Sequence, residues 1–533
     1  MLACPSFPSK LGSLIPVDLD FEGSLMADNL ARLYNERKSL LCTGNDCRLI
    51  RYDVGQVVTI DILPDDVLLA IFDFYVVRYE DLFIPLLFRV GREYRREVES
   101  WQSLVHVCRR WRGLVFASPR RLDLQLFFNP GISARKSLDI WPALPLLIEG
   151  DVTEFSVSNI IAELEHNDRI FRIFIDCYPA SQLENLWTAM QVPFPELAVL
   201  HLSVRGVSHV PVLADSFLGG SAPRLRVIVL NSISFPGLPK LFLSATQLVH
   251  LSLDHIPHSG YISPEAMATC LSVLTGLRFL CFRFQSPQSC PDQENRLSPP
   301  PTRSALPALT QFWFKGVNEY LEELVARVDA PQLLELSTTF FNDIDFDTPE
   351  LIRFVIRSPA RRACNQAHVF FDSQTASVKL QPQASNLERF RVNISCREPD
   401  WQLSSLAQIC TTSLPLLSTT ENLFIYERYN SQLDWKDGIE NIEWLELLLP
   451  FSAVKKLYLS EQFAPRIAPA LQEIAGGGTT EVLPALQNLF LEGFQPSEPV
   501  HEGIERFISA RQLANSPVAI SVWERDPTQE NLY

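Results

Sequence analysis

The sequence has no long uncharged apolar run that could cross a membrane. The nearest segment, VVRYEDLFIPLLFRV, is interrupted by Arg78, Glu80 and Asp81, whereas a membrane helix needs about 18 or more apolar residues in a row. The first residues also lack the basic and apolar regions of a secretory signal. We therefore expect a soluble protein of the cytoplasm, the nucleus or both, with no membrane partner.

Basic residues are in deficit, because 46 lysines and arginines stand against 62 acidic residues and give a formal net charge of -16. A broad nucleic-acid surface needs clustered lysine and arginine, so we expect no nucleic-acid partner. One short region does concentrate arginines, and its ordinary interpretation is the solvated face of an amphipathic helix. These residues are Arg109, Arg110, Arg112, Arg120 and Arg121.

The cysteines show no pairing pattern. They number 11, an odd and irregularly spaced set, which is typical of reduced thiols rather than of a disulfide scaffold. Cys42 and Cys47 could offer two thiolates to zinc, but no further ligands lie at matching spacing. His250, His255 and His258 cluster without a carboxylate or cysteine partner at ligand spacing. The sequence therefore predicts no metal site.

Motifs for common chemistry are missing as well. No phosphate-binding loop, dinucleotide-binding glycine pattern, nucleophile elbow or zinc-protease motif occurs. The glycine-rich segment AGGGTTE, which begins at Ala475, has no lysine, so a turn is its simpler interpretation. We expect neither catalytic residues nor a cofactor. With 47% hydrophobic residues, the chain should nevertheless fold into globular structure.

Two apolar segments in the first quarter of the chain have helical character. The first, LPDDVLLAIFDF from residue 63, predicts a helix with Pro64 at its first position and two aspartates at the positive end of the helix dipole. Large apolar residues occupy every side of this helix, so more than one surface must cover it. The second, SWQSLVHVCRRWRGLVFASP from residue 100, predicts one amphipathic helix.

LPDDVLLAIF followed by LVHVCRRWR resembles the F-box family, whose pattern is Leu-Pro, an acid, an apolar helix that ends near Ile-Phe, and a later Val-Cys-x-x-Trp helix. The two halves lie farther apart here than is usual, so RYEDLFIPLLFRVGREYRREVE between them is interpreted as an insertion or an extended helix. The resemblance implies binding to a Skp-type adaptor and through it to a cullin scaffold. The residues that match positions packing the module or binding the adaptor are Leu63, Pro64, Val67, Leu68, Ile71, Phe72, Val107, Cys108 and Trp111.

The remaining two-thirds of the chain repeats a leucine template, L-x-x-L-x-L, about every thirty residues. About a dozen units begin near residues 170, 197, 225, 248, 277, 309, 333, 367, 387, 421, 454 and 486. This step fits one strand plus one helix or turn per repeat, and it predicts an α/β fold in the form of an irregular leucine-rich-repeat solenoid with parallel strands. A (β/α) barrel is the alternative, but a barrel closes at about eight strands.

Alternation along each strand should place the template leucines on one face and the intervening residues on the other. The second face would offer aromatic and arginine anchors to a protein target. By their phase in the repeat, the candidate target-binding residues are Trp313, Arg391, Tyr458 and Phe490. The segment 507–525 should add a helix and a last strand that cap the array.

The predicted organisation is a partly helical N-terminal extension over 1–58, an F-box-like helical module over 59–118, a connector over 119–165, the solenoid with its C-terminal cap over 166–523, and a tail over 524–533. The resemblance implies the substrate-recognition subunit of an SCF-type ubiquitin ligase, whose repeats bind a protein target of unknown identity. A non-catalytic leucine-rich-repeat scaffold without a link to ubiquitination is the alternative.

Overall fold

The computed structural model describes residues 63–76, 100–119, 121–122, 124–128, 143–153, 156–177, 183–205, 212–289, 303–341, 348–358, 364–382, 390–396, 399–413, 415–428, 441–475, 482–493 and 502–525. The chain divides into two compact units, Met1–Ser100 with Arg525–Tyr533, and Trp101–Glu524. The predicted extension over 1–58, with Cys42 and Cys47, and the segment between the two F-box-like halves lie outside the described residues.

The helix described in the first unit is α2 (Asp65–Tyr75), and its first turn carries Asp65 and Asp66, as the helix dipole favours. The predicted place of Pro64 is wrong by one residue. Pro64 is the N-cap, with an extended ψ of 153°, because its carbonyl accepts the first helical hydrogen bond from the backbone N–H of Leu68 at 3.0 Å. The helix itself is where the apolar pattern predicts it.

The second unit begins with two short helices, α5 (Trp101–Val105) and α6 (Arg109–Ala117), where the sequence predicts one. The single-helix prediction is wrong because Cys108 is extended (φ -155°, ψ 171°), and its sulfur accepts a hydrogen bond from the backbone N–H of Trp111 at 3.4 Å. Cys108 thus acts as the N-cap of α6 and separates the two helices. Trp101, Leu104 and Val115 are still buried, as their spacing indicates.

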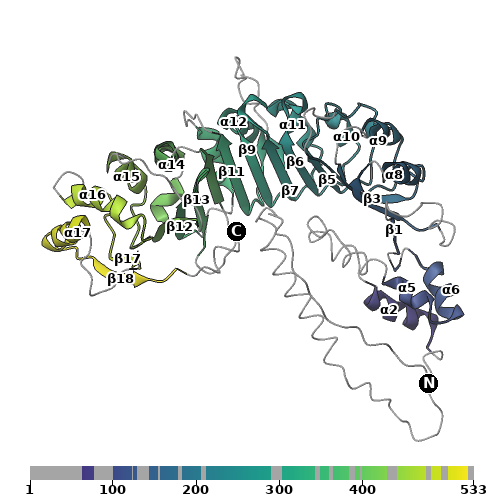
Figure 1. Cartoon of the computed structure of the whole chain (residues 1–533), viewed down its shortest axis with the longest axis horizontal. Coiled ribbons are helices and arrows are strands. Elements are labelled where there is room, and N and C mark those ends of the chain that lie inside the picture. Colours follow the sequence, from purple (N-terminus) through teal and green to yellow (C-terminus); the bar gives the residue numbers. More distant parts are fainter. Residues whose placement is uncertain are drawn as a thin grey trace, which may run out of the picture. The chain divides into compact units, whose positions relative to one another are not determined.

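The second unit is built around one 16-stranded sheet with the order β1-β2-β3-β4-β5-β6-β7-β9-β11-β14-β13-β12-β15-β16-β17-β18 (Figure 1). Its ends, β1 and β18, do not pair with each other, so the described strands form no barrel and that alternative is wrong. The strands are β1 (Leu126–Phe128), β2 (Leu146–Val152), β3 (Ile170–Cys177), β4 (Val199–Val204), β5 (Val227–Asn231), β6 (His250–Ile256), β7 (Phe279–Phe284), β9 (Gln311–Gly316), β11 (Glu335–Phe341), β12 (Gln366–Phe371), β13 (Thr375–Gln381), β14 (Phe390–Ser395), β15 (Asn422–Glu427), β16 (Lys456–Leu459), β17 (Asn488–Glu492) and β18 (Ala519–Trp523).

Each predicted template unit contains a strand of this sheet, and most neighbouring strands are parallel, as predicted. The exception is β13, which pairs antiparallel with both β12 and β14. The chain passes from β11 to β12, turns back through β13, and returns in β14 to the edge of β11. Asp372 fixes the turn, because its Oδ1 accepts from the backbone N–H groups of Gln374 and Thr375 at 2.8 and 2.7 Å.

After α5 and α6, the helices of the second unit lie against the side of the sheet that carries the template residues. Beyond α5 and α6 they are α8 (Val157–Leu164), α9 (Leu183–Ala189), α10 (Leu238–Phe242), α11 (Pro264–Leu271), α12 (Asn318–Arg327), α13 (Pro349–Arg357), α14 (Pro399–Ser413), α15 (Asn441–Leu448), α16 (Ala464–Ala475) and α17 (Glu502–Leu513). From α10 to α17, each helix contacts the next along the chain. Ring contacts from Phe312 to Phe354 on α13 (6.5 Å) and from Phe371 to Trp444 on α15 (6.2 Å) join strands to helices. We call this side of the sheet the packed face.

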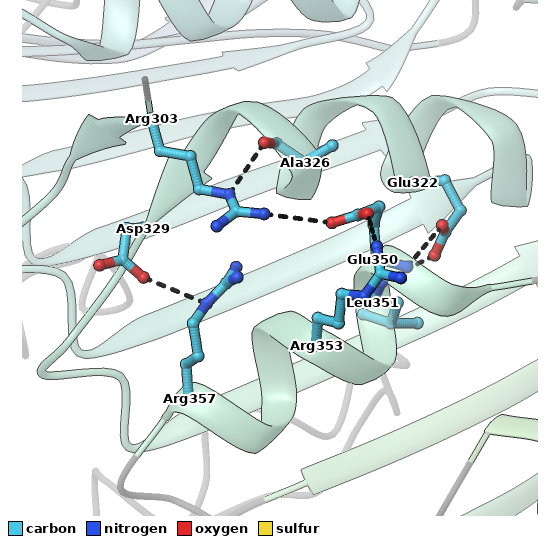
Figure 2. A network of polar contacts seen from close by, with 8 residues as sticks. All are labelled: Arg303, Glu322, Ala326, Asp329, Glu350, Leu351, Arg353 and Arg357. Carbon is cyan, nitrogen blue, oxygen red and sulfur yellow. Dashed lines mark hydrogen bonds and ion pairs between the residues drawn. The ribbon is translucent and has the colours of Figure 1, made fainter. Parts of the chain in front are cut away.

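A polar network ties α12 to α13 (Figure 2). Thr348, the N-cap of α13, makes no side-chain capping bond. Instead, the Glu322 carboxylate on α12 accepts from the backbone N–H groups of Glu350 and Leu351 at 2.9 and 2.8 Å. At the other end of α12, Arg303 Nε donates to the carbonyl of Ala326 at 3.1 Å. Two consecutive repeats are thereby joined by charge-assisted hydrogen bonds.

The same network contains a shared carboxylate. The Glu350 side chain forms ion pairs with Arg303, at 3.3 Å, and with Arg353 on its own helix. Arg357 lies 3.5 Å from Asp329 through its Nε, and β10 (Val328–Asp329) pairs with β8 (Ser304–Ala305) beside these groups. Arg303 precedes α12 in the sequence, whereas the other residues of these ion pairs follow it. The network therefore supports the packing of α12 and α13, and we do not interpret it as a binding site.

We predict that Glu322→Ala lowers the free energy of unfolding by about 1–2 kcal/mol, since it removes the cap of a neighbouring helix. Urea unfolding followed by circular dichroism measures this loss. Glu319→Ala is the matched control, because Glu319 is an exposed glutamate on the same helix, and we expect less than about 0.5 kcal/mol there. Equal losses in the two variants would show that the cap contributes nothing.

Candidate functional site

Helix α2 has two apolar sides. Leu68, Leu69 and Phe72 are buried, whereas Val67, Ile71 and Phe74 are exposed to 39, 40 and 92%. Positions 67, 71 and 74 follow the i, i+4, i+7 spacing of one helix face. The sequence shows large apolar residues on every side of α2. In the structure, one apolar side of this helix is buried and the other faces solvent.

The other F-box-like positions fall into different environments. Leu63 is half-buried and Pro64 is exposed at the start of α2. In the second unit, Val107 is 57% exposed between α5 and α6, while Cys108 and Trp111 are half-buried. The residues of the first half thus lie in one compact unit and those of the second half in the other.

The four candidate target-binding residues lie in one cross-strand row of the sheet. This row runs opposite the packed face, on the side that we call the polar face. From β9 to β17, successive paired residues are Trp313, Ser337, Arg391, Lys379, His368, Phe424, Tyr458 and Phe490. All four candidates are half-buried. The phase along the sequence thus placed the four residues on one face of the sheet, and whether this face binds a target stays a prediction.

The last strands of the row carry a stack of rings. His368 lies 4.5 Å from Phe424, Phe424 lies 4.2 Å from Tyr458, and Tyr458 lies 4.4 Å from Phe490, all between ring centroids and nearly parallel. Trp523 on β18 contacts Phe424 and Tyr458 at 5.9 and 5.7 Å. Strand spacing sets these distances, because paired residues of neighbouring strands lie about 4.8 Å apart.

Of the histidines on this face, sequence reasoning named His250 only as part of a cluster without metal-binding partners, and it missed His201 and His368. His201 stacks on Phe174 at 3.9 Å, and His250 stacks on Phe279 at 4.1 Å. Burial lowers the pKa of each of His201, His250 and His368 to about 3, and the positive charges of Arg172 and Lys379 lower the pKa of His201 and His368 further. All three occupy strand positions that alternate with apolar template residues, which include leucines beside His201 and His250 and are Ala367 and Val369 around His368. That phase is the signal that could have identified them as sheet residues.

Metal ligands, membrane-spanning helices and free thiols can be assessed in the described part of the chain. No group of three or more His, Cys, Asp or Glu side chains within it is arranged to hold a metal ion. Among the same residues, no helix is both long and apolar enough to span a membrane. Seven cysteines in this part are free thiols, and all but the first are buried: Cys108, Cys177, Cys270, Cys281, Cys364, Cys396 and Cys410.

Comparison with protein-family models finds no match for this chain, and a search of the curated proteins finds none either. The functional interpretation therefore depends on the residues themselves.

We predict that stacked histidines make the fold sensitive to acid. His250 is neutral in the folded protein, whereas in the unfolded chain it takes up a proton below about pH 6.5. Its contribution to stability is therefore lost progressively as the pH falls from about 6.5 toward 3. In His250→Phe, the drop in unfolding free energy between pH 7.5 and pH 5 should be smaller by about 1–2 kcal/mol.

Urea unfolding at the two pH values measures this difference. His258→Phe is the control for loss of a histidine, because His258 is exposed in a short turn. An unchanged pH dependence in His250→Phe would contradict a neutral, buried imidazole at this position.

Proposed function

We propose that this protein is the substrate-recognition subunit of an SCF-type ubiquitin ligase. In this proposal, α2 belongs to an F-box module that binds a Skp-type adaptor, and the repeats form a leucine-rich-repeat solenoid that binds a protein target. The observation that carries the proposal is the two-sided apolar character of α2. A helix that buries Leu68 and Phe72 while it exposes Val67 and Ile71 has a second apolar face available for a partner.

The order of the elements supports the same assignment. The F-box-like sequence pattern lies ahead of a region in which each unit adds one strand to a single sheet and, over most of its length, one helix to a single layer. Such an array grows by stacking neighbours and presents a long surface, which suits the recognition of another protein. The residues that follow the strands show no repeated catalytic pattern, so in this proposal the protein contributes binding alone.

In such a complex, the receptor would accelerate the reaction only by holding the target in position. The adaptor and cullin would hold the target beside a separate ubiquitin-conjugating enzyme, which raises the effective concentration of the reacting groups without any catalytic side chain from this chain. Trp313, Arg391, Tyr458 and Phe490 are the proposed anchors for the target, because they share one half-buried row of the polar face.

We predict that Ile71→Asp abolishes co-purification with a Skp-type adaptor, with at least a tenfold loss of recovered adaptor. A carboxylate on the exposed apolar face would have to be desolvated on binding, yet it leaves the buried residues of α2 untouched. Leu63→Asp and Pro64→Ala should weaken adaptor binding in the same direction. The assay is co-expression of the full chain with the adaptor, affinity capture and quantification of the captured adaptor.

Leu243→Asp is the matched control, because Leu243 is an exposed leucine (65%) next to α10 in the second unit. It should capture as much adaptor as the wild type. If the wild-type chain captures no adaptor at matched expression, the receptor assignment is wrong and the scaffold alternative replaces it.

A further inference from the structure

The sheet of the second unit ends in a strand with an open outer edge. Strand β18 is the last in the sheet order (Figure 1) and, among the described residues, it pairs only with β17. Along a strand, the backbone N–H and C=O groups of successive residues point to alternate sides. The N–H of Ala519 donates to the carbonyl of Gln487, just before β17, at 2.9 Å. The N–H and C=O groups of Ile520 and Val522 therefore point away from β17, toward the open edge.

Strand β18 has none of the features that usually protect such an edge. It reads Ala-Ile-Ser-Val-Trp, without proline, lysine or any other charged residue, and its register with β17 runs without a bulge from Ala519 to Trp523. An open edge of this kind is a ready template for pairing with another chain. The opposite end of the sheet differs, because β1 has three residues and Trp101 on α5 donates to the carbonyl of Gln125 beside it at 2.9 Å.

The apolar core is also partly uncovered at this end. On the packed face, Leu459, Leu491 and Val522 pair in succession, and their exposed fractions are 0, 5 and 44%. Ile520 in the neighbouring row is half-buried, although its partner Leu489 is fully buried. A further repeat would cover these residues, as neighbouring repeats cover the other strands. The end of the sheet thus offers both backbone groups and apolar side chains to a partner.

We propose that β18 pairs with β18 of a second copy of this chain, in antiparallel orientation about a two-fold axis, so that the two sheets join into one. Identical edges related by a two-fold axis meet antiparallel, and contacts of this symmetry are the commonest basis of homodimers. The inference goes beyond the proposed function and holds whether or not the chain binds an adaptor.

The outward backbone groups determine the register of this pairing. With Ile520 opposite Val522 of the partner subunit, each of the two symmetry-related pairs exchanges two hydrogen bonds, which uses every outward N–H and C=O group of both strands. A shift by two residues leaves one such pair within the strands and halves the number of bonds. In the favoured register, Ser521 lies on the axis opposite its own copy, and Ala519 lies opposite Trp523 of the partner subunit.

The side chains of β18 suit this register. Ile520 and Val522 place two β-branched residues opposite each other on the packed face, which is a favourable cross-strand pair. On the polar face, the smallest residue of the strand, Ala519, meets the largest, Trp523. The Trp523 ring contacts Tyr458 on β16 at 5.7 Å between ring centroids, so it leans away from the open edge and leaves room for the partner strand. The strand has no charged residue that would meet its own copy across the axis.

Self-pairing also extends the polar face. Tyr458, Phe490 and Ser521 pair in succession, and in the dimer this row continues across the axis into the same residues of the second copy. The proposed target anchors of two chains would then share one continuous face. An extended segment of a different protein is the competing occupant of the edge, and it predicts that the purified chain is monomeric.

We expect the purified full chain to show a concentration-dependent equilibrium between monomer and dimer in sedimentation velocity. Because each copy contributes mainly one five-residue strand, the interface is small, and the dissociation constant should be about 10–100 µM. Higher salt should strengthen the dimer, since it screens the repulsion between two chains that each carry a net charge of -16.

The variant Val522→Pro removes one outward N–H group and leaves the hydrogen bonds to β17 in place, because proline is tolerated on an edge strand when its nitrogen faces outward. It should weaken dimerisation at least tenfold. Val522→Thr is the matched control, since it keeps the N–H group and the branched shape, and it should weaken dimerisation less than threefold. Val522→Lys puts a charge at the edge and keeps the test valid if the proline variant fails to fold.

A disulfide tests the register. Paired residues without mutual hydrogen bonds in an antiparallel sheet have Cα atoms about 4.5 Å apart, within the range that a disulfide spans. Ser521→Cys should therefore form a crosslinked dimer with oxidised glutathione, measured on a non-reducing gel against the wild-type background. Ala519→Cys is the control, because the two copies of residue 519 would lie about 13 Å apart along the strands, and it should crosslink at least tenfold less.

Three results would overturn the inference. The first is a wild-type chain that stays monomeric well above the expected dissociation constant. The second is a dimer that both Val522→Pro and Val522→Lys leave intact, which would place the interface elsewhere. The third is equal crosslinking of the two cysteine variants, which contradicts pairing about Ser521.

Discussion

The continuous rows of apolar residues on the packed face are the constraint on which the rest of the second unit depends. One such row passes from Leu200 through Leu251, Leu336 and Leu423 to Leu489, with each step made by strand pairing. A single repeat cannot bury its own leucines, so each strand is stabilised by the helix above it and the strands beside it. Because side chains alternate along a strand, this row also determines which residues lie on the polar face.

The reversal at β12, β13 and β14 shows how strongly this constraint acts. An antiparallel strand enters an otherwise parallel sheet, and the strand order departs from the chain order. The apolar row is nevertheless unbroken, since Phe390, Leu380 and Ala367 pair in succession and all three are buried. The direction and order of the strands change at this point, but apolar and polar residues still alternate between the two faces of the sheet.

This distinction also explains how much could be predicted from the sequence. The template strands were predictable because apolar periodicity is a local property, and so was the face that carries Trp313 and Tyr458. Strand β13 was missed because TASVKLQ has no template leucine spacing. The break at Cys108 was missed because a sulfur N-cap leaves the helical period of the flanking residues intact. The ring stacking of the histidines depends on which strands pair, and pairing cannot be predicted from one repeat alone.

The two candidate surfaces differ in their physical character, and this difference bears on their roles. The exposed side of α2 is apolar and compact, which suits one partner with a fixed complementary groove. The polar face carries half-buried aromatic rings and charged side chains on many strands, and long-range charge steers association and selects among partners more than it adds affinity. A constant attachment at one surface and a selective contact at the other is the division that the proposed receptor function requires. The same division would be unnecessary in a scaffold whose helical residues only cover the end of the repeats.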